Sequence, residues 1–211
     1  MQYIAERCLI TEICRRLYEK DLIRGPEGNV SVRVDADRIL ATPSGQCKGF
    51  VSAGELVLVD LEGQVLEGHR PPSSELPMHL ALYRARADVR AVVHAHPPAV
   101  LAYSLSRQPL PEKLLPETVL LLGQIARVPP HLPGSDALAQ AVAEALRAPQ
   151  STALLENHGA VTVGHSLEEA WQRMEVFEAA CRAAWMATQL GPLHPLPKPI
   201  LEALRPQGER P

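Results

Sequence analysis

Three histidines occupy positions from which they could hold one metal ion. His94 and His96 lie two residues apart in the β-rich run RAVVHAH, residues 90–96. On a strand, residues i and i+2 point to the same face, so these two imidazoles are expected to lie side by side. His158, in the Glu-Asn-His-Gly break between two other predicted strands, is the best candidate for a third ligand. Three histidines with one open position are typical of catalytic zinc sites.

One glutamate is a candidate for moving protons beside such a metal. Glu75 lies in Pro-Pro-Ser-Ser-Glu at the start of a predicted helix, where it could simply compensate the helix dipole. Beside a dication, however, a carboxylate can serve as general base for a C–H proton. The alternative to the metal hypothesis is that His94 and His96 are incidental strand residues, since an H-x-H pair alone is common.

Three loops rich in small residues could bind an anion through their polar groups. They contain Asn29, then Ser44 with Gly45, and then Ser73 with Ser74. Ser, Asn and Gly amides arranged as nests bind phosphate without needing a lysine. Taken singly, each loop is also consistent with an ordinary turn, so the hypothesis depends on the chemistry around it.

The elements around these residues predict one α/β domain over residues 1–211. Helices are expected at 2–22, 75–87, 99–106, 135–148 and 166–190, and strands at 31–35, 38–42, 55–60, 64–68, 90–96, 118–128, 152–157 and 160–164. Short turns join the strands more often than helices do, which favours a largely antiparallel sheet. The Pro-rich tail from about residue 191 is expected to lie extended over the surface or a neighbouring subunit.

Composition and charge argue against several classes of function. The chain has 46% hydrophobic and 21% charged residues with a net charge of -3, which is ordinary for a globular protein. It shows no basic footprint for nucleic acid and no apolar run near the ~20 residues that span a membrane. Four cysteines without a C-x-x-C pair, and an N-terminus unlike a signal peptide, fit a reducing cytoplasm.

Five motifs occur in an order that resembles the class II aldolase/adducin family. They are Gly28-Asn29-Val30-Ser31, Thr42-Pro43-Ser44-Gly45, Pro72-Ser73-Ser74-Glu75, Val92-Val93-His94-Ala95-His96 and Asn157-His158-Gly159. The resemblance covers nearly the whole chain, and the pattern is most similar to the L-fuculose-phosphate aldolase branch. It implies a three-layer α/β/α sandwich with a central, mainly antiparallel sheet.

The same resemblance implies a zinc-dependent aldehyde-lyase. One Zn²⁺ per subunit would bind His94, His96 and His158, with Glu75 as acid/base, and the three loops would bind a substrate phosphate. The reaction would be reversible cleavage of a ketose 1-phosphate, such as L-fuculose 1-phosphate, to dihydroxyacetone phosphate and a short aldehyde. A homotetramer with active sites at the subunit interfaces is also implied.

The sequence departs from the aldolase pattern at the aldehyde end of the site. The aldolase type carries tyrosines in a mid-chain segment and in the tail, but residues 110–124 and 205–209 contain none. Glu112 or Glu117 could supply an acid in the first region, with Glu117 as our candidate, and Gln207 stands in place of the tail tyrosine. One alternative is a sugar-phosphate 4-epimerase, dehydratase or decarboxylase that uses a similar metal-bound enolate. The other is a non-enzymatic, adducin-like binding module.

Overall fold

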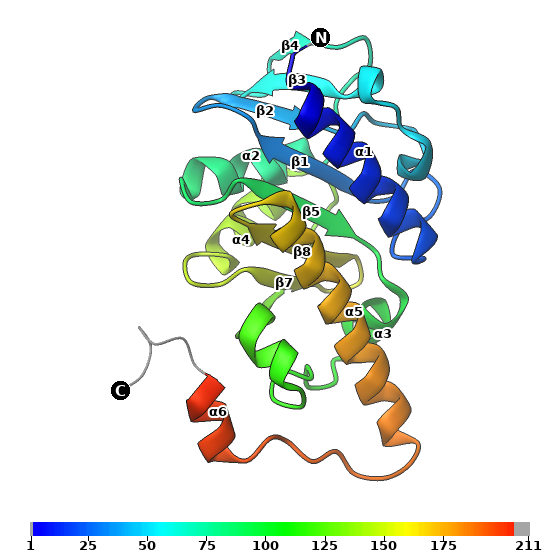
Figure 1. The fold of residues 1–211 in the computed structure, drawn as a ribbon, viewed down its shortest axis with the longest axis vertical. Coiled ribbons are helices and arrows are strands. Elements are labelled where there is room, and N and C mark those ends of the chain that lie inside the picture. Colours follow the sequence, from blue (N-terminus) through cyan, green and yellow to red (C-terminus); the bar gives the residue numbers. More distant parts are fainter. Residues whose placement is uncertain (1, 205–211) are drawn as a thin grey trace.

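An eight-stranded sheet runs through the middle of the molecule, between two layers of helices (Figure 1). The computed structural model describes residues 2–204. The strands are β1 Asn29–Arg33, β2 Arg38–Ala41, β3 Val57–Asp60, β4 Val65–Glu67, β5 Ala91–Ala95, β6 Ala126–Val128, β7 Thr152–Leu155 and β8 Gly159–Gly164. Their order is β4-β3-β2-β1-β5-β8-β7-β6. Among the strands of residues 2–204, only β6 and β7 pair in parallel, so the predicted mainly antiparallel sheet is confirmed.

The helices form the two outer layers of the predicted sandwich. They are α1 Ile4–Glu19, α2 Leu76–Ala85, α3 Pro98–Ser106, α4 Asp136–Ala145 and α5 Leu167–Thr188, whereas the short helix α6, Lys198–Leu204, lies outside both layers and contacts residues 118–122. Val92 and Val93 are neighbours on β5 and enter different hydrophobic clusters, because successive strand residues point to opposite faces. One cluster packs against α1, α3 and α5, and the other against α2 and α4. Within residues 2–204, no helix is both long and apolar enough to traverse a bilayer.

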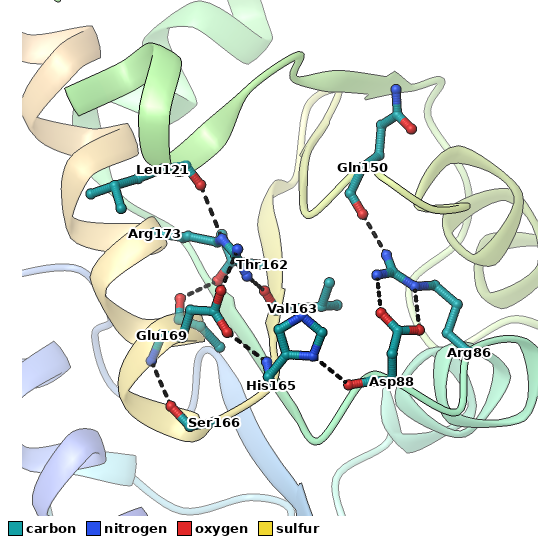
Figure 2. A network of polar contacts seen from close by, with 11 residues as sticks. Arg86, Asp88, Leu121, Gln150, Thr162, Val163, His165, Ser166, Glu169 and Arg173 are labelled. Carbon is teal, nitrogen blue, oxygen red and sulfur yellow. Dashed lines mark hydrogen bonds and ion pairs between the residues drawn. The ribbon is translucent and has the colours of Figure 1, made fainter. Parts of the chain in front are cut away.

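A polar network ties the helices together at the end of the sheet where β5 begins and β8 ends (Figure 2). Arg173 on α5 donates to Glu169 and to the carbonyl of Leu121. Arg86, directly after α2, holds both carboxylate oxygens of Asp88. Because each of the two arginines faces a carboxylate, the charges of the network balance. We call the network of Arg86, Asp88, Glu169 and Arg173 the arginine clamp.

The segment 118–128, predicted as one strand, forms two different elements. Thr118–Leu122 is a π-helical turn, and only Ala126–Val128 pairs with β7. This part of the prediction was wrong. A short apolar run fits a helix as well as a strand, because it shows neither the helical nor the strand period of hydrophobic residues. Gly123, at a φ of +60°, lets the chain turn between the two elements at little steric cost.

The Pro-rich tail is only partly extended, contrary to the prediction. After Gly191 it runs without regular structure to the short helix α6, Lys198–Leu204. On the way, the Leu196 amide donates to the carbonyl of Lys113, so the tail is held against the mid-chain segment of its own subunit. Gln207, the residue in place of a tail tyrosine, lies outside the described residues.

Candidate metal centre

The three predicted histidines meet at the opposite end of the sheet from the arginine clamp. His94 lies on β5, His96 follows that strand directly, and His158 comes just before β8, the antiparallel neighbour of β5. Their ring centroids are 4.8 to 5.2 Å apart. One ligand atom from each ring lies within 4.8 Å of the others. Strand pairing therefore brings together residues that are distant in the sequence, as the metal hypothesis requires.

The imidazoles direct their Nε2 atoms towards one another and towards a carboxylate. His94 donates from Nδ1 to the carbonyl of Ala160 at 2.9 Å. When the ring is neutral, its Nε2 therefore carries a free lone pair. That Nε2 lies 3.0 Å from Nε2 of His96 and 3.1 Å from Oε2 of Glu75. Nε2 of His158 lies 3.2 Å from Oε1 of Glu75. Three ring nitrogens and two carboxylate oxygens thus surround one point.

This donor set fits a divalent cation. Burial lowers the pKa of His96 to about 3, and the nearby His94 and His158 add to the effect, so the ring is neutral at pH 7 and can offer a nitrogen lone pair to a metal. Oε1 of Glu75 is buried and accepts no hydrogen bond, although His158 lies beside it. Among the described residues, no cysteine or fourth histidine joins the cluster. Three imidazoles are the protein ligands of a catalytic rather than a closed structural zinc site.

Glu75 occupies the N-cap of α2 and is 8% exposed. Nδ2 of Asn29 donates to its Oε2 at 2.9 Å. Burial raises the pKa of Glu75, but the adjacent His94 and His158 outweigh that effect and hold the pKa below its usual value. The side chain is therefore an oriented carboxylate next to the ring nitrogens of His94 and His158, which suits a proton acceptor.

Two of the three predicted phosphate loops lie side by side. Pro43 and Pro72 form an isolated β-bridge, the Ser44 amide donates to the carbonyl of Pro71, and the Ser73 amide donates to the carbonyl of Thr42. Those two amides are consequently used within the protein. The next amides, of Gly45 and Ser74, have no partner among residues 2–204. Phosphate binding by these loops stays a prediction.

Asn29 is more buried and makes more side-chain contacts than a phosphate-binding loop residue requires. It is 4% exposed, and its amide contacts Glu75 on one side and His79 on the other. One of its two amide hydrogens has no partner in the described part of the chain, so a contact with a substrate phosphate remains compatible with its position.

Lys48 is a buried cation whose role the sequence did not indicate. It is 2% exposed, and its ammonium donates to the carbonyls of Pro26 at 3.0 Å and Gln46 at 2.7 Å. It thereby links the loop before Asn29 to the loop after Gly45. No carboxylate within residues 2–204 forms an ion pair with it, and a buried charge without a counter-ion is unfavourable. In the sequence it looks like any solvated lysine.

The two mid-chain glutamates lie in different surroundings. Glu112 accepts a hydrogen bond from the amide of Ile125 at 2.9 Å, so its carboxylate connects two parts of the mid-chain segment. Glu117 is exposed at the start of the π-helical turn. Its carboxylate forms no hydrogen bond or ion pair with the described residues. Its role as a second acid stays a prediction.

Comparisons with known proteins point to one family. The sequence matches the family described as Class II Aldolase and Adducin N-terminal domain over residues 8–185. A curated L-fuculose phosphate aldolase of Methanococcus maripaludis is 35% identical over 179 residues, which are 85% of this chain and 96% of that protein. A 3-oxo-tetronate 4-phosphate decarboxylase of Escherichia coli is 35% identical over 177 residues, 82% of each chain.

Two solved structures are similar in fold and sequence. YgbL of Escherichia coli, described as a candidate aldolase, epimerase or decarboxylase, has a TM-score of 0.87 at 33% identity, over 96% of this chain and 98% of that one. L-fuculose-1-phosphate aldolase from Thermus thermophilus has a TM-score of 0.77 at 30% identity, over 86% of this chain and 94% of that one.

Proposed function

Because this chain belongs to the class II aldolase and adducin family, we propose that it is a zinc-dependent aldolase. Its proposed reaction is the reversible cleavage of a ketose 1-phosphate, similar to L-fuculose 1-phosphate, into dihydroxyacetone phosphate and a short aldehyde. The observation that carries the proposal is the convergence of His94, His96 and His158 beside the Glu75 carboxylate. The same donor set argues against an adducin-like binding module, because a non-enzymatic module needs neither metal ligands nor a general base.

The three histidines would hold the ion through their Nε2 atoms. A bound dication stabilises the negative charge that develops on the substrate oxygen when the carbon–carbon bond breaks. The bond from Nδ1 of His94 to the Ala160 carbonyl fixes the tautomer and orientation of that ring. The fold therefore prepares the ligand before any ion arrives.

Glu75 would move the proton. Its oxygens lie 3.1 and 3.2 Å from the ligand nitrogens of His94 and His158, next to where the reacting carbon must lie. In the condensing direction the carboxylate removes a proton from the carbon adjacent to the carbonyl, and in cleavage it returns that proton. The hydrogen bond from Asn29 keeps the carboxylate in place for both steps.

The substrate phosphate is proposed to bind where the two bridged loops meet. The proposed ligands are Asn29, Ser44, Gly45, Ser73 and Ser74. The free amides of Gly45 and Ser74 support this placement, because clustered amides bind phosphate oxygens. The buried ammonium of Lys48, which is tied to both neighbouring loops, adds positive charge near the same surface.

Replacing Lys48 by Met is expected to weaken substrate binding without slowing the chemical step. We predict that KM for the phosphorylated substrate, and the inhibition constant of inorganic phosphate, rise by about tenfold, because the phosphate would lose a nearby positive charge; tenfold corresponds to ~1.4 kcal/mol. The exposed Lys20, which pairs with Glu175 on the surface, provides the matched control Lys20→Met. Equal phosphate inhibition in the two variants would remove Lys48 from the proposed site.

A decarboxylase is the second candidate, and the aldehyde end of the site favours it. No tyrosine occurs in residues 110–124, and the loss of carbon dioxide requires no acid for an aldehyde oxygen. The Escherichia coli relative at 35% identity is a 3-oxo-tetronate 4-phosphate decarboxylase. Both reactions place a carbanion beside a carbonyl, so one metal site with one general base serves either.

Product analysis separates the candidate reactions. Purified, zinc-loaded protein is incubated with L-fuculose 1-phosphate and with a 3-oxo-tetronate 4-phosphate, and the products are followed by NMR and mass spectrometry. The aldolase proposal predicts dihydroxyacetone phosphate and an aldehyde from the first compound. Release of carbon dioxide from the second alone would favour the decarboxylase, and an isomer of unchanged mass would indicate an epimerase. No turnover of either compound would contradict the lyase proposal.

We retain Glu117 as the proposed acid for the aldehyde oxygen. Glu117→Gln is expected to lower kcat for aldol cleavage by about 100-fold, a typical contribution of general acid catalysis, with no change in thermal stability. Glu112→Gln is the matched comparison, because it weakens the bond to Ile125 and should lower stability while sparing kcat. An unchanged kcat in the Glu117 variant would exclude its catalytic role.

We also propose that the chain works in the cytoplasm as a homotetramer with active sites near the subunit interfaces. Large apolar side chains stay exposed on α5 and on the π-helical turn, among them Trp185 at 56% and Leu120 at 56%. Apolar side chains gathered on a surface are commonly covered by a partner. Sedimentation velocity at micromolar concentration should give a tetramer, and a monomer would contradict the assembly.

A further inference from the structure

We propose that His79 is a positioning residue that orients the Glu75 carboxylate through Asn29. The proposal rests on the proton-transfer role assigned above to Glu75, and it adds a buried relay that reaches from the site into the core. His79 lies on α2, one helical turn after Glu75. In the sequence it resembles an ordinary packed histidine, and only its contacts distinguish it.

Four hydrogen bonds connect five side chains in a single line. Tyr83 Oη lies 2.8 Å from Oγ of Ser31, and that Oγ lies 2.6 Å from Nδ1 of His79. Nε2 of His79 lies 2.5 Å from Oδ1 of Asn29, and Nδ2 of Asn29 lies 2.9 Å from Oε2 of Glu75. All five side chains are buried, with Glu75 the most exposed at 8%. Bulk water therefore does not compete for these bonds.

The line has only one consistent direction. An ionised carboxylate accepts only, so Asn29 must donate to Glu75 and its Oδ1 must face His79. An amide oxygen also accepts only, so the proton of the neutral His79 ring is on Nε2. Burial lowers the pKa of His79 to about 3, which agrees with a neutral ring. Nδ1 then accepts from the Ser31 hydroxyl, which in turn accepts from Tyr83.

The His79 donor decides which end of the Asn29 amide faces the site. Without it, a flipped amide would place its oxygen against the Glu75 carboxylate, or the buried Oδ1 would be left without a partner. Both outcomes are unfavourable, because a buried polar atom without a hydrogen bond is costly. His79 thus keeps an N–H group aimed at Glu75 although it does not touch the reacting atoms.

The first test reads the tautomer of His79 in the intact zinc protein. Long-range ¹H–¹⁵N correlation spectra of histidine-labelled protein, assigned with the His79→Gln variant, should show a proton on Nε2 and none on Nδ1. A proton on Nδ1 would overturn the proposal, since the line would then run the wrong way. This readout needs no substrate, so it stands even if no sugar phosphate is turned over and the proposed function fails.

The second test separates positioning from folding, with the sugar phosphate that the product analysis identifies. His79→Leu should lower kcat by about 10- to 100-fold, as loss of an outer partner typically does, with KM within about threefold and full zinc content. His79→Gln offers an N–H near the Nε2 position and should recover most of that loss. Thr162→Val, which deletes a buried hydroxyl bond to the Ala170 carbonyl elsewhere in the core, controls for lost stability.

A double-mutant comparison shows whether His79 acts through Asn29. In an Asn29→Ala background, His79→Leu should cause no further loss of kcat, because residues in one network are not additive. Multiplicative losses, or a kcat for His79→Leu equal to that of Thr162→Val, would show that His79 is only a packed core histidine.

Discussion

Replacing Glu75 by Gln is expected to lower kcat by about 10²- to 10⁴-fold, the range that general acid–base catalysis supplies, while zinc content stays at one ion per subunit. The amide has nearly the shape of the carboxylate but cannot take a proton from carbon. The three ligand nitrogens of the histidines are untouched, so the metal should stay bound. KM is expected to change much less than kcat, because the lost interaction belongs to the chemical step.

Solvent exchange provides a direct measurement for Glu75. In deuterium oxide, the wild-type protein should introduce deuterium at the carbon adjacent to the carbonyl of dihydroxyacetone phosphate, and the Gln variant should not. Glu169→Gln is the matched control, because that carboxylate belongs to the arginine clamp at the other end of the sheet. Exchange at the wild-type rate in the Glu75 variant would assign the proton transfer to another group.

Removing one imidazole is expected to abolish both metal retention and activity. In His158→Ala only two histidine ligands remain, and activity at equimolar zinc should fall below detection. The wild-type protein at a free zinc concentration of 1,000 times its dissociation constant gains about 4 kcal/mol of stability by mass action. That gain should disappear on treatment with a chelator, and it should be missing from the variant.

Thermal unfolding with and without chelator, together with metal analysis, checks this expectation. His165→Ala is the matched control, because His165 is an exposed histidine beside Asp88 at the opposite end of the sheet. It should keep the zinc-dependent rise in melting temperature. The same rise in His158→Ala would show that the three-histidine cluster is not where zinc binds.

Local patterns in the sequence were sufficient to predict most elements and the candidate metal ligands that the fold brings together. Ser135 and Ser166 cap α4 and α5 as short polar residues before apolar helices do. The period of two predicted that His94 and His96 lie on the same side at the end of β5, because strand geometry is local. The choice of His158 came from its place in the break between two predicted strands, but its proximity to His94 depends on the pairing of β5 with β8.

Features that depend on tertiary contacts could not be predicted from the sequence. Residues 118–122 form a π-helical turn rather than a strand, and this turn packs against α5. Hydrophobicity alone does not distinguish a turn from a strand here. Lys48 and His79 look like a surface lysine and a packed histidine until their buried partners are known. Their roles arise from side chains that only the fold brings together.

A crystal structure of the purified protein, with diffraction data collected at the zinc absorption edge, tests the metal hypothesis most directly. It should show one anomalous peak at about 2.0–2.1 Å, the usual zinc–nitrogen distance, from Nε2 of His94, His96 and His158, with non-protein oxygen completing the coordination. A peak elsewhere, no peak at all, or a fourth permanent protein ligand in place of that oxygen would contradict a catalytic zinc site.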